Sequence, residues 1–307
     1  MKQLRTLNEM LEHARTVGPM SISVACAADA DVLEAVEAAR QKGVATASLV
    51  GEADKIAAAA KGAGVDISNF EVVDEQGGEA AAALKAVELV SSGKAQILMK
   101  GMLHTDNFLR GVLNKEKGLR SGGVISHIYF HEIEGYDRII FISDGAFILY
   151  PDLPTKARII DNAVKFAHSF GIETPKVAVL AAVEVVNPDM PPTLDAAALA
   201  QMNRRGQIKG CVVDGPFALD NAVSELSARQ KGITSEVAGK ADILIVPNIE
   251  SGNILAKSLV YFAPNKTAGI VIGAKAPIVL TSRSDSAEAK MFSIAAAVVG
   301  AAYQGGR

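Results

Sequence analysis

The chain has 307 residues, of which 49% are hydrophobic and 21% are charged, and its formal net charge is −3 at pH 7. This balance is typical of a globular protein with a sizeable core and excludes a disordered chain. It gives no electrostatic reason to expect nucleic acid or an anionic membrane surface as a partner. Because Trp is absent and aromatic residues make up only 5%, the core must be built from Ala, Val, Ile and Leu, as in packed parallel sheets.

The cysteines and the apolar stretches bear on the cellular compartment. Cys26 and Cys211 are far apart, and each lies in an apolar run, which favours two buried free thiols over a disulfide or a nucleophile. No spacing of cysteines and histidines indicates a metal site. The apolar stretches are broken well short of a membrane span, and the first residues lack the apolar segment of a signal peptide. We therefore expect a cytoplasmic protein that binds no membrane.

Short β-branched runs alternate with longer amphipathic runs along the chain. The pattern predicts helices over 3–16, from Asp29 or Asp31 to about 41, and over 53–61, 79–90, 104–114, about 155–170, 194–203, 219–226, 253–262 and 286 to about 299. It predicts strands over 22–27, 45–50, 70–73, 97–100, 122–130, 138–143, 177–182, 211–214, 243–246, 269–273 and 278–280.

Strands separated by helices of this length imply right-handed βαβ units and a mainly parallel sheet. The number of strands exceeds what one open sheet usually carries, so we predict two α/β domains. The predicted first domain comprises 1–143 together with 285–307, and the second comprises 144–284. The chain would cross between them in a segment that contains Pro151 and Pro154, and again near Ser282.

The sequence contains no Walker-type phosphate loop, Rossmann glycine fingerprint or nucleophile elbow in a suitable context, which counts against NTP hydrolysis, simple dinucleotide binding and serine-hydrolase chemistry. What remains is a set of strand-to-helix junctions rich in small polar and cationic residues. Ligands of open α/β sheets bind at the carboxyl ends of strands, where helix N-termini attract anions.

The first junction follows the predicted strand at 97–100. Lys100, His104 and Arg110 place three cationic or donor groups beside a helix start, and Thr105 offers a hydroxyl and an amide to an anion. The alternative is that Thr105 or Asp106 only caps the helix and Arg110 is a solvated charge.

The second junction follows the strand that ends at Pro247. Gly252 and Asn253 open the predicted helix, which carries Lys257 one turn later. Glycine there allows a backbone N–H to approach a ligand closely. The alternative is a tight loop in which Ser251 caps the helix and Lys257 is only exposed.

The third junction contains Ser282 and Arg283. The planar guanidinium of Arg283 suits a phosphate, and Ser282 can donate to a developing negative charge. Asp285 and Glu288 have the spacing of a capping box, with Asp285 as N-cap and Glu288 at the third helical position. We favour this structural role for both acids.

Together these junctions resemble the phosphate acetyltransferase and phosphate butyryltransferase family. The matching segments follow in family order: Gly101–Thr105 with Arg110, Asp214–Pro216, Val237–Asp242, Pro247 with Gly252, Asn253 and Lys257, and Ser282–Arg283. The resemblance implies a two-domain α/β fold similar to that of isopropylmalate dehydrogenase, with the active site in the interdomain cleft. It also implies a homo-oligomer, such as a homodimer, that converts acyl-CoA and inorganic phosphate to acyl phosphate and CoA, reversibly and without a bound cofactor.

One departure from the family concerns the general base. The acetyl-transferring branch has an Asp where this sequence has Ala289, and Arg283 is followed by Ser284 instead of Gly. The sequence is therefore closer to the butyryltransferase branch, and Glu288 is the nearest acid. The family roles imply that Arg283 with Arg110 holds phosphate, and that Ser282 stabilises the oxyanion or the departing thiolate.

Three alternatives stay open at this stage. One is a phosphate acetyltransferase. Another is a nicotinamide-dependent dehydrogenase on the same scaffold, although the sequence assembles neither a nicotinamide site nor metal-binding aspartates. The third is a non-catalytic ligand-binding protein, which Ala289 in place of an acid keeps open.

Overall fold

The computed structural model describes residues 2–282 and 284–306. The chain folds into two compact α/β units. Unit 1 contains Val124–Thr267 and the described residues before Asn8. Unit 2 contains Asn8–Gly123 and the described residues from Ala268 onward.

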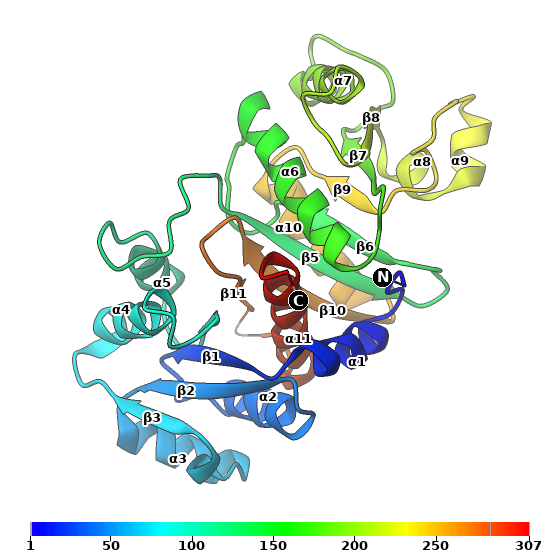
Figure 1. Cartoon of the computed structure of the whole chain (residues 1–307). Coiled ribbons are helices and arrows are strands. Elements are labelled where there is room, and N and C mark those ends of the chain that lie inside the picture. The colour runs from blue at the N-terminus through cyan, green and yellow to red at the C-terminus, as the bar shows by residue number, and fades with distance from the viewer. Residues whose placement is uncertain (1, 283, 307) are drawn as a thin grey trace. The chain divides into compact units, whose positions relative to one another are not determined.

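Unit 2 has a mainly parallel sheet in the order β3-β2-β1-β4-β11-β10, in which β10 runs antiparallel to its neighbour β11 and the other neighbours are parallel. Strands β1, β2 and β3 lie side by side in Figure 1. The strands are β1 (Met20–Ala25), β2 (Ala45–Gly51), β3 (Glu71–Asp74), β4 (Ile97–Lys100), β10 (Asn265–Ile272) and β11 (Ile278–Val279). The helices are α1 (Leu7–Val17), α2 (Ala30–Gln41), α3 (Ala53–Ala63), α4 (Gly78–Ser91), α5 (Thr105–Val112) and α11 (Ala287–Gln304).

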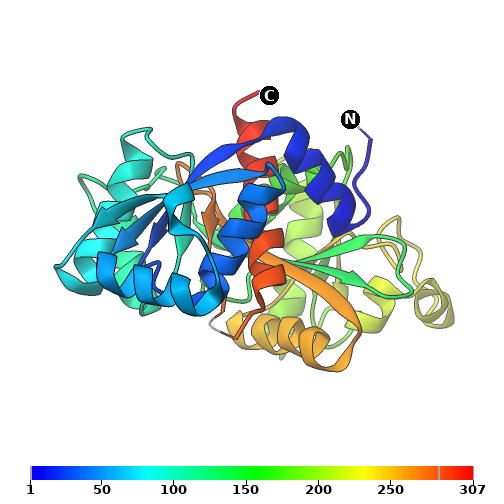
Figure 2. The ribbon, with the colours of Figure 1, turned by 90° about the horizontal axis from the view of Figure 1, so that it is seen from below.

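The helices of unit 2 form two packed groups. Helix α2 contacts α3 and α11, and α4 contacts α5 (Figures 1 and 2). Helix α11 is apolar around nearly its whole circumference, and most of its residues are buried, as expected for a helix without a polar face. Helix α2 begins as predicted after the N-cap Asp29, whose side chain accepts from the Val32 amide.

Unit 1 has the strand order β5-β6-β9-β7-β8, in which β5 and β6 are antiparallel and the other neighbours are parallel. The strands are β5 (Ser126–Ile133), β6 (Ile139–Ser143), β7 (Lys176–Leu180), β8 (Val212–Phe217) and β9 (Ile243–Ile245). The helices are α6 (Leu153–Ser169), α7 (Pro191–Arg204), α8 (Leu219–Val223), α9 (Glu225–Gln230) and α10 (Ile249–Phe262).

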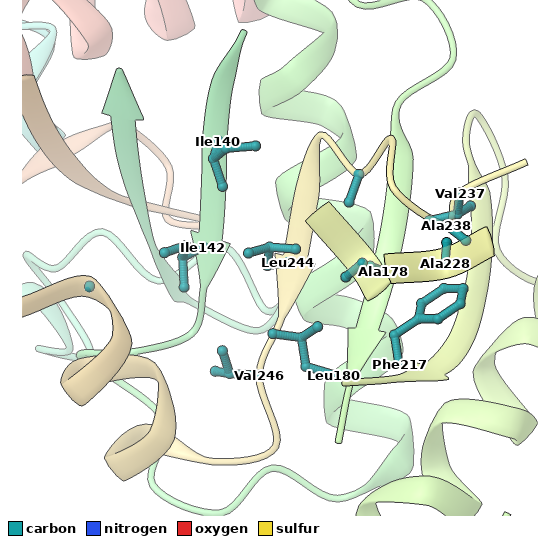
Figure 3. Packing of buried hydrophobic residues seen from close by; sticks show 13 residues of the cluster. Ile140, Ile142, Ala178, Leu180, Phe217, Ala228, Val237, Ala238, Leu244 and Val246 are labelled. Carbon is teal, nitrogen blue, oxygen red and sulfur yellow. The ribbon is translucent and has the colours of Figure 1, made fainter. Parts of the chain in front are cut away.

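The core of unit 1 is divided by the pleat of its sheet. Ile140 and Ile142 of β6 join a mainly aliphatic cluster that also contains Leu244 of β9 and Phe217 of β8 (Figure 3). Phe141, between the two isoleucines, belongs to a separate aromatic cluster, where its ring meets that of Phe170 edge to face.

The predicted α/β class with mainly parallel sheets is confirmed in both units. The unit boundaries differ from the predicted ranges: the chain changes unit after residues 123 and 267, whereas crossings were expected after 143 and 284. The reason is strand pairing. The antiparallel β5–β6 pair joins β9, so both strands belong to unit 1, and the later change falls inside the single strand β10.

Two predicted elements are wrong in detail. The helix expected over 219–226 is broken at Ser224, which has an extended backbone and caps α9 through the Ser227 amide. The strand expected over 122–130 begins at Ser126, because Gly122 takes a positive φ of 84° in the preceding turn. In the described part of the chain, every helix is too short or too polar to cross a bilayer.

Candidate functional site

The carboxyl edge of the unit 2 sheet holds the junction after β4. Gly101 follows the last residue of β4, and a Cβ there would lie 2.3 Å from the carbonyl oxygen of Cys26. The Met102 amide donates to that same oxygen at 2.9 Å. Only glycine permits this close passage of the loop across the end of β1.

A cavity of about 460 Å³ lies at this junction, lined by Lys100, Leu103, His104, Thr105, Asp106, Asn107 and Arg110. The structure therefore brings together all four residues that the sequence predicted at the first junction. Lys100 is buried, and its Nζ donates to the Gly101 carbonyl at 3.3 Å, whereas Arg110 is exposed.

The start of α5 differs from the capping alternative. The N-cap is His104, so Thr105 and Asp106 are the first two helical residues and neither is the cap. The His104 side chain makes no capping bond to a described residue. The amides of the first turn thus point out of the helix, where an anion can accept from them.

Glu79 was missed by the sequence analysis. It lies in the first turn of α4, and its Oε2 accepts from the His104 amide at 3.0 Å and from Asn107 Nδ2 at 2.9 Å. The bond from Asn107, followed by that from the His104 amide, holds the pKa of Glu79 below its usual value. The sequence shows only that Glu79 is an acid at the start of a helix. It does not show that the carboxylate contacts a loop 25 residues away.

Glu79 also borders a second cavity of about 260 Å³. The other lining residues include Cys26, Glu52, Glu75 and Met102. Burial raises the pKa of the Cys26 thiol to about 11, so the thiol stays protonated at neutral pH and is a poor nucleophile. Cys26 and Cys211 are both free, but each is only partly buried, whereas two buried free thiols were predicted.

The second junction, in unit 1, differs from its prediction. Helix α10 begins at Ile249, and its N-cap is Asn248, whose side chain accepts from the Ser251 amide at 3.0 Å. Gly252 therefore does not open the helix, and Ser251 does not cap it. The Gly252 amide donates within the helix to the Asn248 carbonyl at 3.2 Å, so it is engaged and not turned toward a ligand.

Gly252 is required by packing. A Cβ at this position would lie 2.7 Å from Val246 Cγ2 and 2.8 Å from Gly145 Cα. Asn253 reinforces the same contact by donating from Nδ2 to the Gly145 carbonyl at 3.1 Å. Lys257 is exposed one turn further along α10.

At the third junction, Ser282 is held by Asp285. The Ser282 amide donates to Asp285 Oδ2 at 2.7 Å, and the Asp285 amide donates to the Ser282 carbonyl at 3.2 Å. The Ser282 hydroxyl lies 3.0 Å from that of Ser284. Arg283 lies outside the described residues.

The predicted capping box at this junction is wrong. The N-cap of α11 is Ser286, whose hydroxyl accepts from the Ala289 amide at 3.2 Å, so the helix begins one residue later than expected. This frees Asp285 for Ser282. The buried Lys290 supports the turn: it donates to the Asp285 carbonyl and lies 3.7 Å from a carboxylate oxygen of Asp31.

Glu288 lies apart from the predicted residues of the first junction. It borders a cavity of about 410 Å³ formed with α1 and α2, which contribute Leu11 and Ala38. None of the residues around that cavity lines the one at Lys100. Over residues 2–282 and 284–306, no group of three or more acidic, His or Cys side chains is arranged to hold a metal ion.

Comparison with solved structures relates both units to known proteins. A branched-chain phosphotransacylase from Enterococcus faecalis V583 is 32% identical, with a TM-score of 0.81 over 92% of this chain and 99% of that one. A 4-hydroxythreonine-4-phosphate dehydrogenase from Klebsiella pneumoniae has a TM-score of 0.57 at 13% identity over 92% of this chain and 100% of that one, which shows a similar fold only.

Comparison of sequences gives higher identities. The phosphate butyryltransferase of Clostridium acetobutylicum is 53% identical over 96% of this chain and 98% of its own length. The phosphate acetyltransferase of Thermotoga maritima is 45% identical over 95% of this chain and 99% of its own. The family model described as Phosphate acetyl/butaryl transferase matches residues 6–85 and 79–298. The chain therefore belongs to the phosphate acetyl/butaryl transferase family.

Proposed function

We propose that the chain is an acyltransferase that converts butyryl-CoA, or a similar short-chain acyl-CoA, and inorganic phosphate to acyl phosphate and CoA, reversibly. The observation that carries this proposal is the 53% identity, over 96% of the chain, to a protein named phosphate butyryltransferase. The predicted butyryltransferase-like departures at Ser284 and Ala289 support the same branch.

The reaction is a direct displacement at the thioester carbonyl. A phosphate oxygen attacks the carbonyl carbon, a C–O bond forms, the C–S bond breaks, and the thiolate leaves and takes up the proton that the phosphate loses, which gives CoA. Because phosphate is largely dianionic at neutral pH and a thiol has a pKa of about 8.5, the step needs neither a strong protein base nor a bound cofactor. Holding the reactants together can contribute about 7–11 kcal/mol in favourable cases.

Ser282 and Arg283 have complementary roles in this proposal. Ser282 is exposed, and Asp285 fixes its backbone, so its hydroxyl can be directed at charge that develops on the carbonyl oxygen or on the departing sulfur. Arg283, next in the sequence, offers a planar guanidinium for phosphate. Glu288 as a catalytic acid has weaker support, because it borders the cavity formed with α1 and α2.

Phosphate groups of the substrates fit the cavity at α5. Lys100, His104, Thr105 and Arg110 combine positive charge with the free amides of a helix start. In unit 1, Lys257 is exposed and suited to a CoA phosphate, whereas Gly252 and Asn253 act by fixing α10 against Gly145.

A phosphate acetyltransferase is the second candidate, favoured by the 45% identity to the Thermotoga maritima enzyme of that name. The two candidates differ in the acyl group that is accepted. One methylene in an apolar pocket changes selectivity by only about 1–3 kcal/mol, so activity with both substrates is compatible with either assignment.

The test is a thiol-release assay with acetyl-, butyryl- and isobutyryl-CoA, each with and without phosphate. Release that requires phosphate and is fastest with butyryl- or isobutyryl-CoA is the expected result. Fastest release from acetyl-CoA selects the second candidate, and no phosphate-dependent release from any thioester would contradict both.

We also propose a cytoplasmic homo-oligomer, as the family resemblance suggests. Its support is a group of large apolar side chains that are exposed on α10 and on the loop that binds its first turn, namely Leu149, Tyr150, Ile254, Tyr261 and Phe262. Such groups are typical of surfaces that contact another chain.

A further inference from the structure

Glu79 places a carboxylate beside a cavity that is otherwise suited to anions. Lys100 and His104 line that cavity. The hydrogen bond from Asn107, then that from the His104 amide, lower the pKa of Glu79, and the charges of His104 and Lys100 contribute less. The carboxylate is therefore ionised at neutral pH, and its charge alone would oppose the binding of a phosphate group. Glu79 can therefore favour phosphate binding only through an effect that outweighs the repulsion between its carboxylate and the phosphate.

The bonds of Glu79 indicate that effect. A single oxygen, Oε2, accepts from the backbone amide of the N-cap His104 and from the side chain of Asn107 one turn later. Both donors belong to the start of α5, whereas Glu79 belongs to the first turn of α4. These two helices pack together, so the carboxylate joins their N-terminal ends.

The pattern of occupied and unoccupied donors is selective. Glu79 engages the His104 amide, which precedes the helix, and the side chain of Asn107 in the first turn. The first-turn amides of α5, beginning at Thr105, keep the outward direction in which an anion can accept from them. The helix start is thus fixed without being capped.

We propose that Glu79 is a positioning residue for phosphate recognition, which holds the first turn of α5 so that its free amides and Thr105 face the same bound phosphate group as Lys100. The inference rests on the proposed function for the identity of the ligand. The phosphate group could be that of inorganic phosphate or one of those on CoA, and the experiment below separates the two.

Two substitutions at Glu79 distinguish positioning from charge. Glu79→Ala removes both bonds, whereas Glu79→Gln keeps an oxygen that can accept both and removes the charge. The matched control is Glu52→Gln: Glu52 borders the same second cavity as Glu79, but its carboxylate pairs with Lys55 at 2.7 Å, so the substitution leaves the two bonds between Glu79 and α5 in place.

The measurements are KM and kcat with acyl-CoA and phosphate varied separately, and the Kd of CoA by isothermal titration calorimetry. We expect Glu79→Ala to raise KM about tenfold for one of the two substrates, as loss of a hydrogen bond to a charged group does, with kcat changed less than about threefold. If CoA is the substrate affected, its Kd rises by the same factor. Glu79→Gln and Glu52→Gln should stay within about threefold of the wild type.

Asn107→Ala provides a second variant in case Glu79→Ala unfolds. If Asn107 acts through Glu79, its effect on KM disappears in the Glu79→Ala background; if it contacts substrate independently, the effects add. Lower KM values in both Glu79 variants, or unchanged KM and Kd in Glu79→Ala, would overturn the proposal. Failure of the proposed function would instead appear as no phosphate-dependent turnover by the wild type, while the calorimetric comparison with CoA still tests the role of Glu79.

Discussion

Ser282 carries the proposed contact with developing charge, and Asp285 fixes the backbone from which its hydroxyl projects. Ser282→Ala should lower kcat about 100-fold, the cost of losing one oxyanion donor in other enzymes, with little change in KM because the contact forms in the transition state. Ser284→Ala, which removes the hydroxyl 3.0 Å away, is the control and should cost much less. Steady-state kinetics check both, and equal losses in the two variants would contradict the assignment to Ser282.

His131 gives a prediction for pH. The side chain is fully buried, and neither ring nitrogen has a hydrogen-bond partner among the described residues. Burial lowers its pKa to about 4 from an ordinary value near 6.5. The neutral ring is thus favoured in the folded state, so its contribution to stability is complete above about pH 6.5 and is lost as the pH falls toward 4, by at most about 1.4 kcal/mol per pH unit.

We expect the fall in Tm between pH 7 and pH 5 to be smaller for His131→Phe than for the wild type. Thermal unfolding followed by circular dichroism at both pH values measures this. Comparing the two proteins cancels the contributions of other titrating groups, such as Asp144, whose burial raises its pKa to about 6. Parallel Tm profiles in the two proteins would show that His131 does not titrate as described.

At the residue scale, the sequence identified Lys100, His104, Thr105 and Arg110 as neighbours, because they lie within one junction. Glu79 and the role of Asp285 could not be found in the same way. Glu79 reaches α5 only through the packing of two helices, and Asp285 was assigned to a cap that Ser286 provides.

Helix α10 allows a test at the scale of one element. Gly252→Ala would place a Cβ 2.7 Å from Val246 Cγ2 and 2.8 Å from Gly145 Cα, so we expect it to destabilise the protein by about 1–3 kcal/mol through overpacking. Gly62→Ala in α3 is the matched control, since a Cβ there meets nothing within 4 Å, and it should stabilise by about 0.5–1 kcal/mol. Urea denaturation gives both values, and a gain in stability in Gly252→Ala would contradict the packing role.

The elements themselves were largely predictable, because apolar periodicity and caps mark them. Strand β4 occupies the range predicted for it, and α2 starts after Asp29 as expected. The start of α10 was missed because Gly252 was interpreted as a helix opening, whereas Asn248 provides the cap and the glycine serves a contact with Gly145. A close contact between two backbone segments that are far apart in the sequence produces no recognisable pattern in the sequence around either of them.

At the scale of the whole molecule, the sequence predicted two α/β units but not where the chain changes from one to the other. The number of strands indicated two units, and this count did not depend on exact strand ends. The crossing points depend on which strands pair, and the pairing of β5 with β6 and of β6 with β9 is non-local.

The exposed apolar side chains of unit 1 predict the assembly state. We expect light scattering after size exclusion to give a mass of at least twice that of the 32.0 kDa chain. Tyr261→Glu combined with Phe262→Glu places two charges at side chains that are 67% and 88% exposed, and it should shift the mass toward the monomer. Leu226→Glu, at a 58% exposed position on α9, is the control. A wild-type mass of one chain would contradict the proposed homo-oligomer.

The central proposal is that phosphate displaces CoA from a short-chain thioester. Phosphorus-31 NMR of the purified chain with butyryl-CoA and excess phosphate tests it most directly, with free thiol measured in the same sample. We predict an acyl phosphate resonance that grows in equal amount to the thiol and disappears when excess CoA is added. Thiol release without acyl phosphate, or no release at all, would contradict the proposal.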